Sequence, residues 1–317
     1  MRKLLNVLYV MSPEAYITRD GQNVVVRVQE KERARYPIHI LESIVCFNYP
    51  GVSPQLMALC AESGVALSFL TQHGKFLARV TGPTMGNVLL RRQQYRLADD
   101  EEACTSVVAS FISAKIANCR SVLRRAVRDH EETVDVDRLY QAIGQLSDCL
   151  RRLKNPQGVD ELRGIEGEAA NIYFGCFDEL ILENKPGFGF EGRNRRPPRD
   201  NMNALLSFLY TLLAHDVQSA LETVGLDPYV GFLHRDRPGR PSLALDLMEE
   251  LRPYLADRLA LSLVNRKQVA AKGFRTSENG AVTMSDDTRK TVLAAWQKRK
   301  QETIMHPFLQ EKIEVGL

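Results

Sequence analysis

The sequence predicts an α+β fold, in which a small β domain at residues 1–85 precedes a larger all-α domain at residues 86–317. Up to residue 82, apolar and polar residues alternate in short runs, which is the period of half-buried strands. After a segment containing Gly82, Pro83 and Gly86, apolar residues recur every three or four positions, which is the helical period. A chain of 317 residues is long enough to bury two separate cores.

The N-terminal domain is expected to hold short strands and one helix. The pairs Asp20–Gly21 and His73–Gly74 are typical of hairpin turns. Residues 53–63 interrupt the strand pattern with helical periodicity, and Ser53 is a good N-cap for this helix. The predicted strands cover residues 4–11, 15–21, 22–29, 39–48, 65–72 and 74–82.

The second domain is predicted from a series of amphipathic segments, the longest of which covers residues 101–130. Residues 301–317 contain no pattern from which a structure or a role can be predicted. The other predicted helices cover residues 87–98, 134–154, 158–184, 200–224, 242–265 and 286–301.

The composition is typical of a soluble globular protein in a reducing compartment. Hydrophobic residues make up 44% and charged residues 26%, and no apolar run approaches the roughly 18 residues of a membrane span. The start, MRKLLNVLYVM, lacks a small-residue cleavage site and continues into strand-like alternation, which argues against a signal peptide. The six cysteines form no CxxC pair and mostly lie among apolar neighbours, which favours buried thiols in the cytoplasm.

Residues 231–253 combine the side chains that a metal site needs. His234 lies in a loop rich in Gly and Pro, ahead of a helix for which Ser242 is a plausible N-cap. Asp246 and Glu249 are three positions apart, so a helix brings both carboxylates to one face, within reach of one cation. Taken alone, such a pair is more often a solvated helix face.

A further acidic candidate is Glu166, which stands between two glycines in the segment GIEGEAANIYFG. Small neighbours leave its carboxylate open to a bulky partner. Glu168 lies two residues further on, so a helix turns it away from the same cation. Together with His234 and Glu249, Glu166 suggests a carboxylate and histidine metal site in an enzyme of nucleic-acid metabolism.

The net charge of +3 does not by itself indicate DNA binding, so local clusters of basic residues have to be considered. The densest has four arginines within seven positions, beside two prolines that exclude a helix. Guanidinium groups on an extended loop suit phosphate contacts, although such a cluster standing alone is more often a solvated loop. Two more arginines flank the His234 loop. The candidate DNA-binding residues are Arg193, Arg195, Arg196, Arg199, Arg237 and Arg240.

Other polar residues share helix faces with these candidates. Asn203, Ser207 and Tyr210 fall at i, i+4 and i+7, directly after the arginine loop, and Tyr173 lies seven residues after Glu166. They suit either the positioning of phosphates or a satisfied place in the core, and the second reading is slightly favoured for Tyr210.

Three segments in order resemble one known family: GIEGEAANIYF, then GRNRRPPRDNMNALLSFLY, then GLDPYVGFLHRDRPGRPSLALDLMEELRP. Along nearly its whole length the chain is similar to the CRISPR-associated integrases, the metal-dependent nuclease subunits of spacer acquisition. The amino-acid sequences of the N-terminal strands and of the segment LRGIEGEAA resemble those of the variant that accompanies type I-C systems. The resemblance implies a β-sandwich-like N-terminal domain and a helical C-terminal domain, joined by a short linker near residues 82–87.

The resemblance also implies the site residues. The family's metal ligands are a Glu, a His and an acid, which fall on Glu166, His234 and Glu249. Asp246 matches a further acidic position of the family's site and is the second choice for direct ligation. Two acids and one imidazole with open positions suit Mg²⁺ or Mn²⁺, and do not resemble a closed zinc site.

The implied function is the insertion of short foreign DNA fragments, called spacers, into a CRISPR array. A DNA 3′-hydroxyl attacks a phosphodiester in this reaction, and water in its place would make the same site an endonuclease. The implied partners are double-stranded and branched DNA, a second copy of the chain in a homodimer, and a dimer of a small ferredoxin-like CRISPR-associated protein. No membrane partner is expected.

Two other classes of function stay open at this point. A structure-specific DNA repair nuclease would prefer branched junctions to repeat DNA and need no protein partner. A non-catalytic DNA-binding scaffold would use the arginines alone and show no dependence on metal. A helical di-iron protein is disfavoured because Glu-x-x-His pairs are absent around Glu166 and Glu249.

Overall fold

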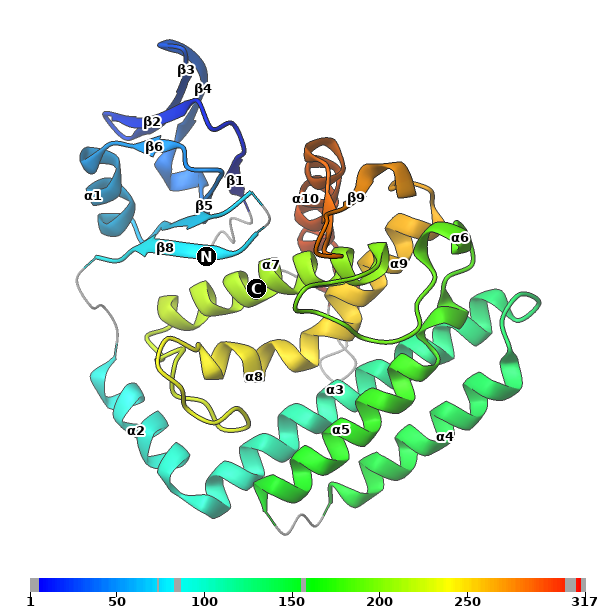
Figure 1. The fold of residues 1–317 in the computed structure, drawn as a ribbon. Coiled ribbons are helices and arrows are strands. Elements are labelled where there is room, and N and C mark those ends of the chain that lie inside the picture. The colour runs from blue at the N-terminus through cyan, green and yellow to red at the C-terminus, as the bar shows by residue number, and fades with distance from the viewer. Residues whose placement is uncertain (1–5, 73, 83–86, 155–157, 306–311, 315–317) are drawn as a thin grey trace. The chain divides into compact units, whose positions relative to one another are not determined.

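The computed structural model describes residues 6–72, 74–82, 87–154, 158–305 and 312–314. The chain divides into two compact units, residues 1–86 with 293–317, and residues 87–292 (Figure 1). The division into domains 1–85 and 86–317 stays a prediction, and residues 293–317 group with the first unit in the structure. The expected linker falls largely on residues 83–86, which lie outside the described residues.

The first unit contains two four-stranded sheets. One has the order β1-β5-β7-β8, in which β1 (Val7–Val10), β5 (Ser43–Phe47) and β7 (Ala66–Leu70) are parallel and β8 (Phe76–Val80) is antiparallel to β7. The other has the order β4-β3-β2-β6. Its strands are β2 (Ala15–Asp20), β3 (Asn23–Val28), β4 (Lys31–Pro37) and β6 (Gly51–Val52).

Both sheets and the helix α1 (Pro54–Glu62) contribute to one hydrophobic core. Ile44 and Leu67 come from the first sheet, Ile17 from the second, and Leu56 from α1, and all four are fully buried. The packing of two sheets on one core agrees with the β-sandwich-like arrangement that the resemblance implies. Ser53 caps α1 as predicted, because its side chain accepts a hydrogen bond from the Leu56 N–H.

The two hairpins are present, although the turn chemistry differs slightly from the prediction. Asp20 ends β2 and pairs with Asn23, so Gly21 and Gln22 form the loop, with Gly21 at φ +60°. Gly74, at φ +84°, lies between β7 and β8, while His73 lies outside the described residues. Strand β4 was not predicted, because its residues are mostly exposed at a sheet edge and show no alternating burial.

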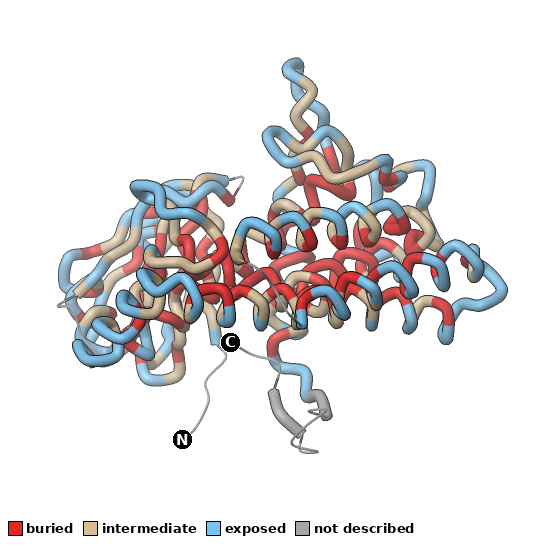
Figure 2. Tube along the Cα trace, turned by 90° about the horizontal axis from the view of Figure 1, so that it is seen from below, coloured by how far each residue is buried: buried red, intermediate tan, exposed pale blue. Residues whose placement is uncertain are grey.

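The second unit is built around long helices. Figure 1 shows α3 (Glu101–His130), α4 (Val136–Arg152) and α5 (Val159–Gly175) side by side, and all three pack on one another. The helices α7 (Asn201–Thr223) and α8 (Ser242–Leu251) pack together, and α8 also packs on α3. Figure 2 shows buried and exposed residues alternating along the helices, as expected for helices that bury one face.

The remaining helices are α2 (Val88–Asp99), α6 (Lys185–Phe188), α9 (Arg258–Asn265) and α10 (Asp286–Lys300). Residues 242–265, predicted as one helix, contain a π-helical segment at Arg252–Asp257 between α8 and α9. Pro253 stands in this segment, where its missing N–H interrupts the regular hydrogen-bond pattern. Side chains of this π-helical segment contribute to the candidate site described below.

The predicted α+β fold class is confirmed, with two short strand pairs that were not predicted. The antiparallel pairs β9 (Phe274–Thr276) with β10 (Val282–Met284), and β11 (Thr303–Met305) with β12 (Lys312–Glu314), were missed because strands of three residues show no periodicity. All six cysteines are free and buried, as predicted. Among the described helices, none has both the length and the apolar character that crossing a bilayer would require.

Candidate metal centre

Three packed helices of the second unit place two acids around one cation. Glu166 comes from α5, Glu249 from α8 and Lys115 from α3, which packs on both. The Lys115 Nζ atom contacts Glu166 Oε1 and lies 2.6 Å from Glu249 Oε2. The side chains of Lys115 and Glu249 are 9% and 6% exposed, so these two members of the ion triad are buried. Two of the three predicted ligands therefore converge on one positive charge.

The glycines around Glu166 fulfil the role that the sequence suggests. A Cβ atom on Gly164 or on Gly167 would meet no atom within 4 Å, so both positions border open space. The Glu166 side chain keeps 26% of its surface exposed, while the exposed Glu168 points to Arg152 instead. The carboxylate of Glu166 is accordingly the accessible member of the triad.

Glu249 is held between two cations. Its Oε1 lies 2.5 Å from Arg252 Nη1, and its Oε2 accepts no hydrogen bond from any residue that the structure describes. Burial raises the pKa of Glu249, but the positive charges of Arg252 and Lys115 outweigh burial and bring this pKa to about 2. Glu249 is therefore a carboxylate at neutral pH, with Arg252 against one oxygen and Lys115 against the other.

Asp246 organises the loop that carries His234. This residue is completely buried, and its carboxylate accepts hydrogen bonds from the N–H groups of Phe232, Leu233 and His234 at 2.6, 2.9 and 2.9 Å. Its Oδ1 also lies 2.6 Å from the Nδ1 atom of His234. Both oxygens are thus occupied by protein donors, so the geometry gives Asp246 a positioning role and leaves the Nε2 atom of His234 for a ligand.

The start of α8 differs from the prediction. Ser242 is the first helical residue and its side chain makes no capping hydrogen bond, so its assignment as N-cap is wrong. The N–H groups of Leu243 and Ala244, in the first turn of the helix, instead donate hydrogen bonds to the carbonyl oxygen of Pro228. Close packing of the loop on the helix explains Gly231, because a Cβ there would lie 2.6 Å from Ser242 Cβ.

A second buried acid lies behind the triad. Asp257 accepts hydrogen bonds from Tyr210 at 2.6 Å and from Tyr173 at 3.1 Å. Burial raises the pKa of Asp257 to about 6, although both tyrosine hydrogen bonds lower it. Arg252 connects the two acids, because its guanidinium contacts Glu249 and lies 4.8 Å from the Tyr210 ring centroid. The two tyrosines therefore support the site from its buried side.

The six candidate arginines fall into two groups. Arg193 folds inward, donating hydrogen bonds to Asn203 and Ser207 at 2.5 and 3.1 Å. Arg240 likewise turns back onto its own loop, where it donates to Ser242 Oγ and to the Arg235 carbonyl. The four that are exposed and so accessible to phosphate are Arg195, Arg196, Arg199 and Arg237.

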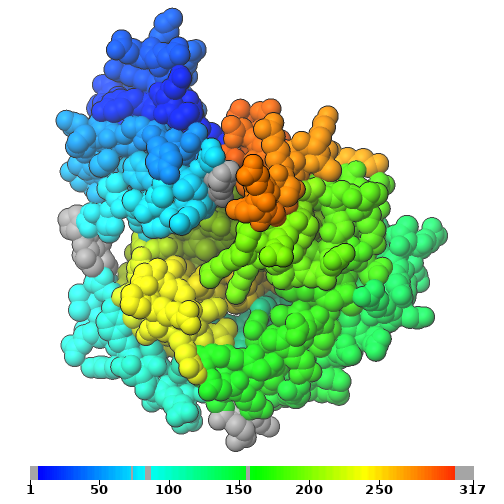
Figure 3. Space-filling view, viewed as in Figure 1, coloured from blue at the N-terminus to red at the C-terminus, as the bar shows by residue number. Residues whose placement is uncertain are grey.

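The structure leaves the complete metal centre as a prediction. Within the described ranges, no three His, Cys, Asp or Glu side chains are close enough to hold a metal ion. The donors nevertheless fit a hard divalent cation, because carboxylates from two helices already converge on one positive charge. The His234 loop lies at the surface of the second unit, where its segment is yellow in Figure 3.

Sequence reasoning missed Lys115, Arg252 and Arg163. Arg163 donates to the Leu233 carbonyl at 3.0 and 2.6 Å and so helps to hold the His234 loop. Lys115 had a detectable signal, because it stands at a buried position of α3 between Ile112 and Cys119. A lysine on an apolar helix face needs an acidic partner, and that partner could have been sought among the candidate ligands.

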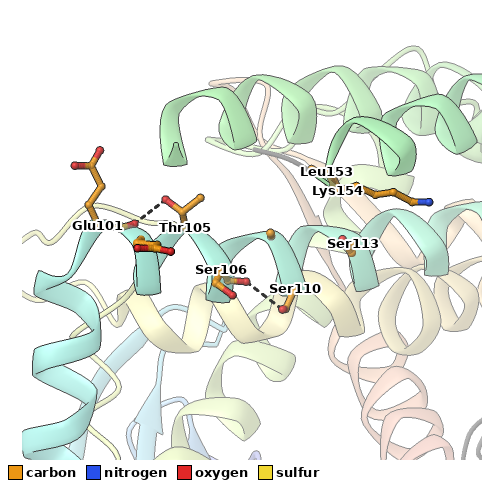
Figure 4. Close-up of a pocket in the computed structure, with 9 residues that line it drawn as sticks. Glu101, Thr105, Ser106, Ser110, Ser113, Leu153 and Lys154 are labelled. Atoms are coloured by element: carbon orange, nitrogen blue, oxygen red, sulfur yellow. Dashed lines mark hydrogen bonds between the residues drawn. The ribbon is translucent and has the colours of Figure 1, made fainter. Parts of the chain in front are cut away.

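Two surface grooves lie away from the triad. Figure 4 shows the larger one, of about 740 Å³, which is lined by polar residues of α3 such as Glu101, Ser106 and Ser113, and by Lys154. The smaller one, of about 600 Å³, includes Phe232 and Arg235 of the His234 loop. Neither groove is lined by Lys115, Glu166 or Glu249.

Comparison with known proteins identifies the family. The family described as CRISPR associated protein Cas1 matches residues 8–298. This chain belongs to the Cas1 family. A protein named CRISPR-associated endonuclease Cas1 1 from Chlorobaculum tepidum is 52% identical over 317 residues, covering 100% of this chain and 92% of the relative. A protein named CRISPR-associated endonuclease Cas1 2 from Rhodospirillum rubrum is 51% identical over 321 residues, covering 100% of this chain and 92% of the relative.

Solved structures of other proteins share this fold. A CAS1 protein from Thermotoga maritima superimposes with a TM-score of 0.81 at 23% identity, over 94% of this chain and 90% of that chain. A casposase bound to its integration product gives a TM-score of 0.83 at 23% identity, over 98% of this chain and 86% of that chain. These likenesses confirm the fold of an N-terminal β-rich region followed by a helical region.

Proposed function

We propose that this Cas1 family member is a metal-dependent DNA endonuclease and integrase that inserts spacers into a CRISPR array. The proposal is supported by the convergence of Glu166 and Glu249 on one positive charge and, separately, by an imidazole that Asp246 holds in place. The relatives that share half of its residues are named endonucleases. One buried and one accessible acid, together with an oriented histidine, suit phosphodiester chemistry.

Glu166, His234 and Glu249 would hold Mg²⁺ or Mn²⁺, through two carboxylates and the Nε2 atom of His234. When bound, the cation supplies positive charge that offsets the charge developing on the phosphate oxygens during attack by a DNA 3′-hydroxyl. Asp246 fixes the ring of His234 through the contact at Nδ1, and Arg252 keeps Glu249 ionised. The protein's own contribution is therefore the fixed orientation of three donors.

We propose that the substrates are double-stranded and branched DNA, contacted through Arg195, Arg196, Arg199 and Arg237. Exposed guanidinium groups can form paired hydrogen bonds with phosphate oxygens without reading base sequence. One structural neighbour is a casposase bound to integration product and another is a Cas6-RT-Cas1–Cas2 complex. By analogy, we propose a cytoplasmic homodimer that assembles with a dimer of a small ferredoxin-like CRISPR-associated protein, in a type I-C system.

The decisive experiment is a strand-transfer assay on labelled branched DNA with a free 3′-hydroxyl, with Mn²⁺ and with EDTA. Wild type should join the strands only with Mn²⁺, and Glu166→Gln should not, because one proposed ligand is lost. Glu168→Gln is the matched control, since Glu168 lies on the same helix and is 50% exposed. Equal activity of wild type and Glu166→Gln would contradict the proposal. DNA binding without metal-dependent chemistry would favour a scaffold.

A further inference from the structure

We infer that Lys115 is an internal counter-ion that holds Glu166 and Glu249 together and competes with the divalent cation for both carboxylates. This inference rests on the proposed function, because it takes the two acids to be metal ligands. Lys115 is not one of the proposed metal ligands, but its charge lowers the affinity of the centre for metal.

The position of the ammonium group carries the inference. Lys115 reaches from α3 to acids on two other helices, contacting Glu166 Oε1 and lying 2.6 Å from Glu249 Oε2. The latter oxygen is buried and accepts no hydrogen bond from the described part of the chain, so its contact with Lys115 is an ion contact. An ammonium group at this distance from two carboxylates takes the place that a bridging cation needs.

The energetic reason for such a group is the repulsion between two nearby acids. Leaving a buried carboxylate without a counter-charge is strongly destabilising. Arg252 does not replace Lys115, because Arg252 contacts the other oxygen of Glu249, Oε1. In the metal-free protein, Lys115 therefore keeps Glu166 and Glu249 close together.

Metal binding must then separate Lys115 from the acids. A divalent ion and an ammonium ion cannot share the same oxygens without strong repulsion, and the flexible four-carbon side chain of lysine allows the ammonium to move. The affinity for metal is consequently lower than two free carboxylates and an imidazole would give. The centre fills only when the cation is concentrated enough to displace the ammonium.

The test is calorimetric titration of Mn²⁺ into the full chain without DNA, for wild type and Lys115→Met. Lys115→Met should bind Mn²⁺ at least about tenfold more tightly, because a unit charge a few Å from the bound ion is removed. Lys115→Arg keeps the charge and should bind no more tightly than wild type. If the methionine variant does not fold without metal, Lys115→Gln keeps hydrogen-bonding capacity without the charge and should show the same gain.

Glu166→Gln separates failure of this inference from failure of the proposed function. One outcome is that Glu166→Gln weakens Mn²⁺ binding, while Lys115→Met and Lys115→Gln bind Mn²⁺ as wild type does. This outcome would overturn the role of Lys115 and leave the metal centre standing. A gain in Lys115→Arg as large as in Lys115→Met would also overturn it. Mn²⁺ binding that is absent, or indifferent to Glu166, would remove the metal centre and the inference together.

Discussion

The carboxylate of Asp246 lies 2.6 Å from the Nδ1 atom of His234 and also accepts three backbone N–H groups of the His234 loop. One buried acid thus fixes both the path of the loop and the orientation of the His234 ring. The Nε2 atom of His234 is left to face a ligand, which is the arrangement that an oriented metal ligand or a proton acceptor needs.

Asp246→Asn should disable the site while leaving the other acids in place. The amide would set an NH₂ group against N–H donors, so we expect a loss of about 3 kcal/mol of unfolding free energy. Strand transfer should fall about 10- to 100-fold, as is usual when the partner of a ligating histidine is lost. Chemical denaturation and the strand-transfer assay measure the two effects. Asp236→Asn, on the exposed part of the same loop, should change neither.

The pKa of Glu249 predicts how stability depends on pH in the metal-free protein. Because folding lowers this pKa from 4.5 to about 2, Glu249 contributes about 3 kcal/mol of stability above pH 4.5, which is lost as the pH falls through 2. Glu249→Gln should remove this rise in stability with pH. Unfolding free energies measured in EDTA between about pH 2 and pH 6 test the expectation.

The neighbouring Glu250 supplies a control of opposite sign. Burial raises the pKa of Glu250 above 4.5, so its contribution to stability is greatest at low pH and declines as the pH rises. Glu250→Gln should therefore make the protein relatively more stable at neutral pH, whereas Glu249→Gln should make it less stable. The same direction of change in both variants would contradict the assignment of Glu249 as the acid held by Lys115 and Arg252.

Much of this site was predictable from short-range patterns. The spacing of Asp246 and Glu249 places both on one helix face, and the structure buries both. The helix at residues 101–130 begins and ends as predicted, because its apolar stripe is long and regular. Spacing reveals which face a residue occupies, but it does not reveal which group from a distant helix meets that face.

That limit explains the main omissions. Lys115 lies on α3, and its pairing with Glu249 depends on how helices far apart in sequence pack together. Arg252 is different, because it follows Glu249 by three residues and their ion pair is a local one that spacing could have indicated. The role of Asp246 was also hidden, because its partners are mainly backbone N–H groups, which every sequence contains. The three-residue strands of the β9–β10 hairpin are too short for any period to appear.

The arginine loop should show two different responses to substitution. Replacing Arg195, Arg196 and Arg199 together by Gln should weaken DNA binding and reduce the slope of log Kd against log salt by about 3, because each phosphate contact contributes roughly one unit. Arg193→Gln should instead lower the melting temperature, since Arg193 hydrogen-bonds Asn203 and Ser207. Fluorescence anisotropy at several salt concentrations and thermal melts separate the two. An unchanged salt slope in the triple variant would exclude this loop from the DNA interface.

Two glycines near the site predict stability changes of opposite sign. At Gly231 a Cβ atom would lie 2.6 Å from Ser242 Cβ and 2.9 Å from Asp246 Oδ2, so Gly231→Ala must push the His234 loop away from α8. We expect a loss of roughly 1 to 3 kcal/mol in unfolding free energy, together with reduced strand transfer.

At Gly164, on α5, a Cβ atom would meet nothing within 4 Å, and alanine is the better helix former. Gly164→Ala should therefore stabilise the protein by about 0.5 to 1 kcal/mol. Urea denaturation of both variants tests the pair, and a neutral Gly231→Ala would mean that the loop does not pack tightly on Asp246 in solution.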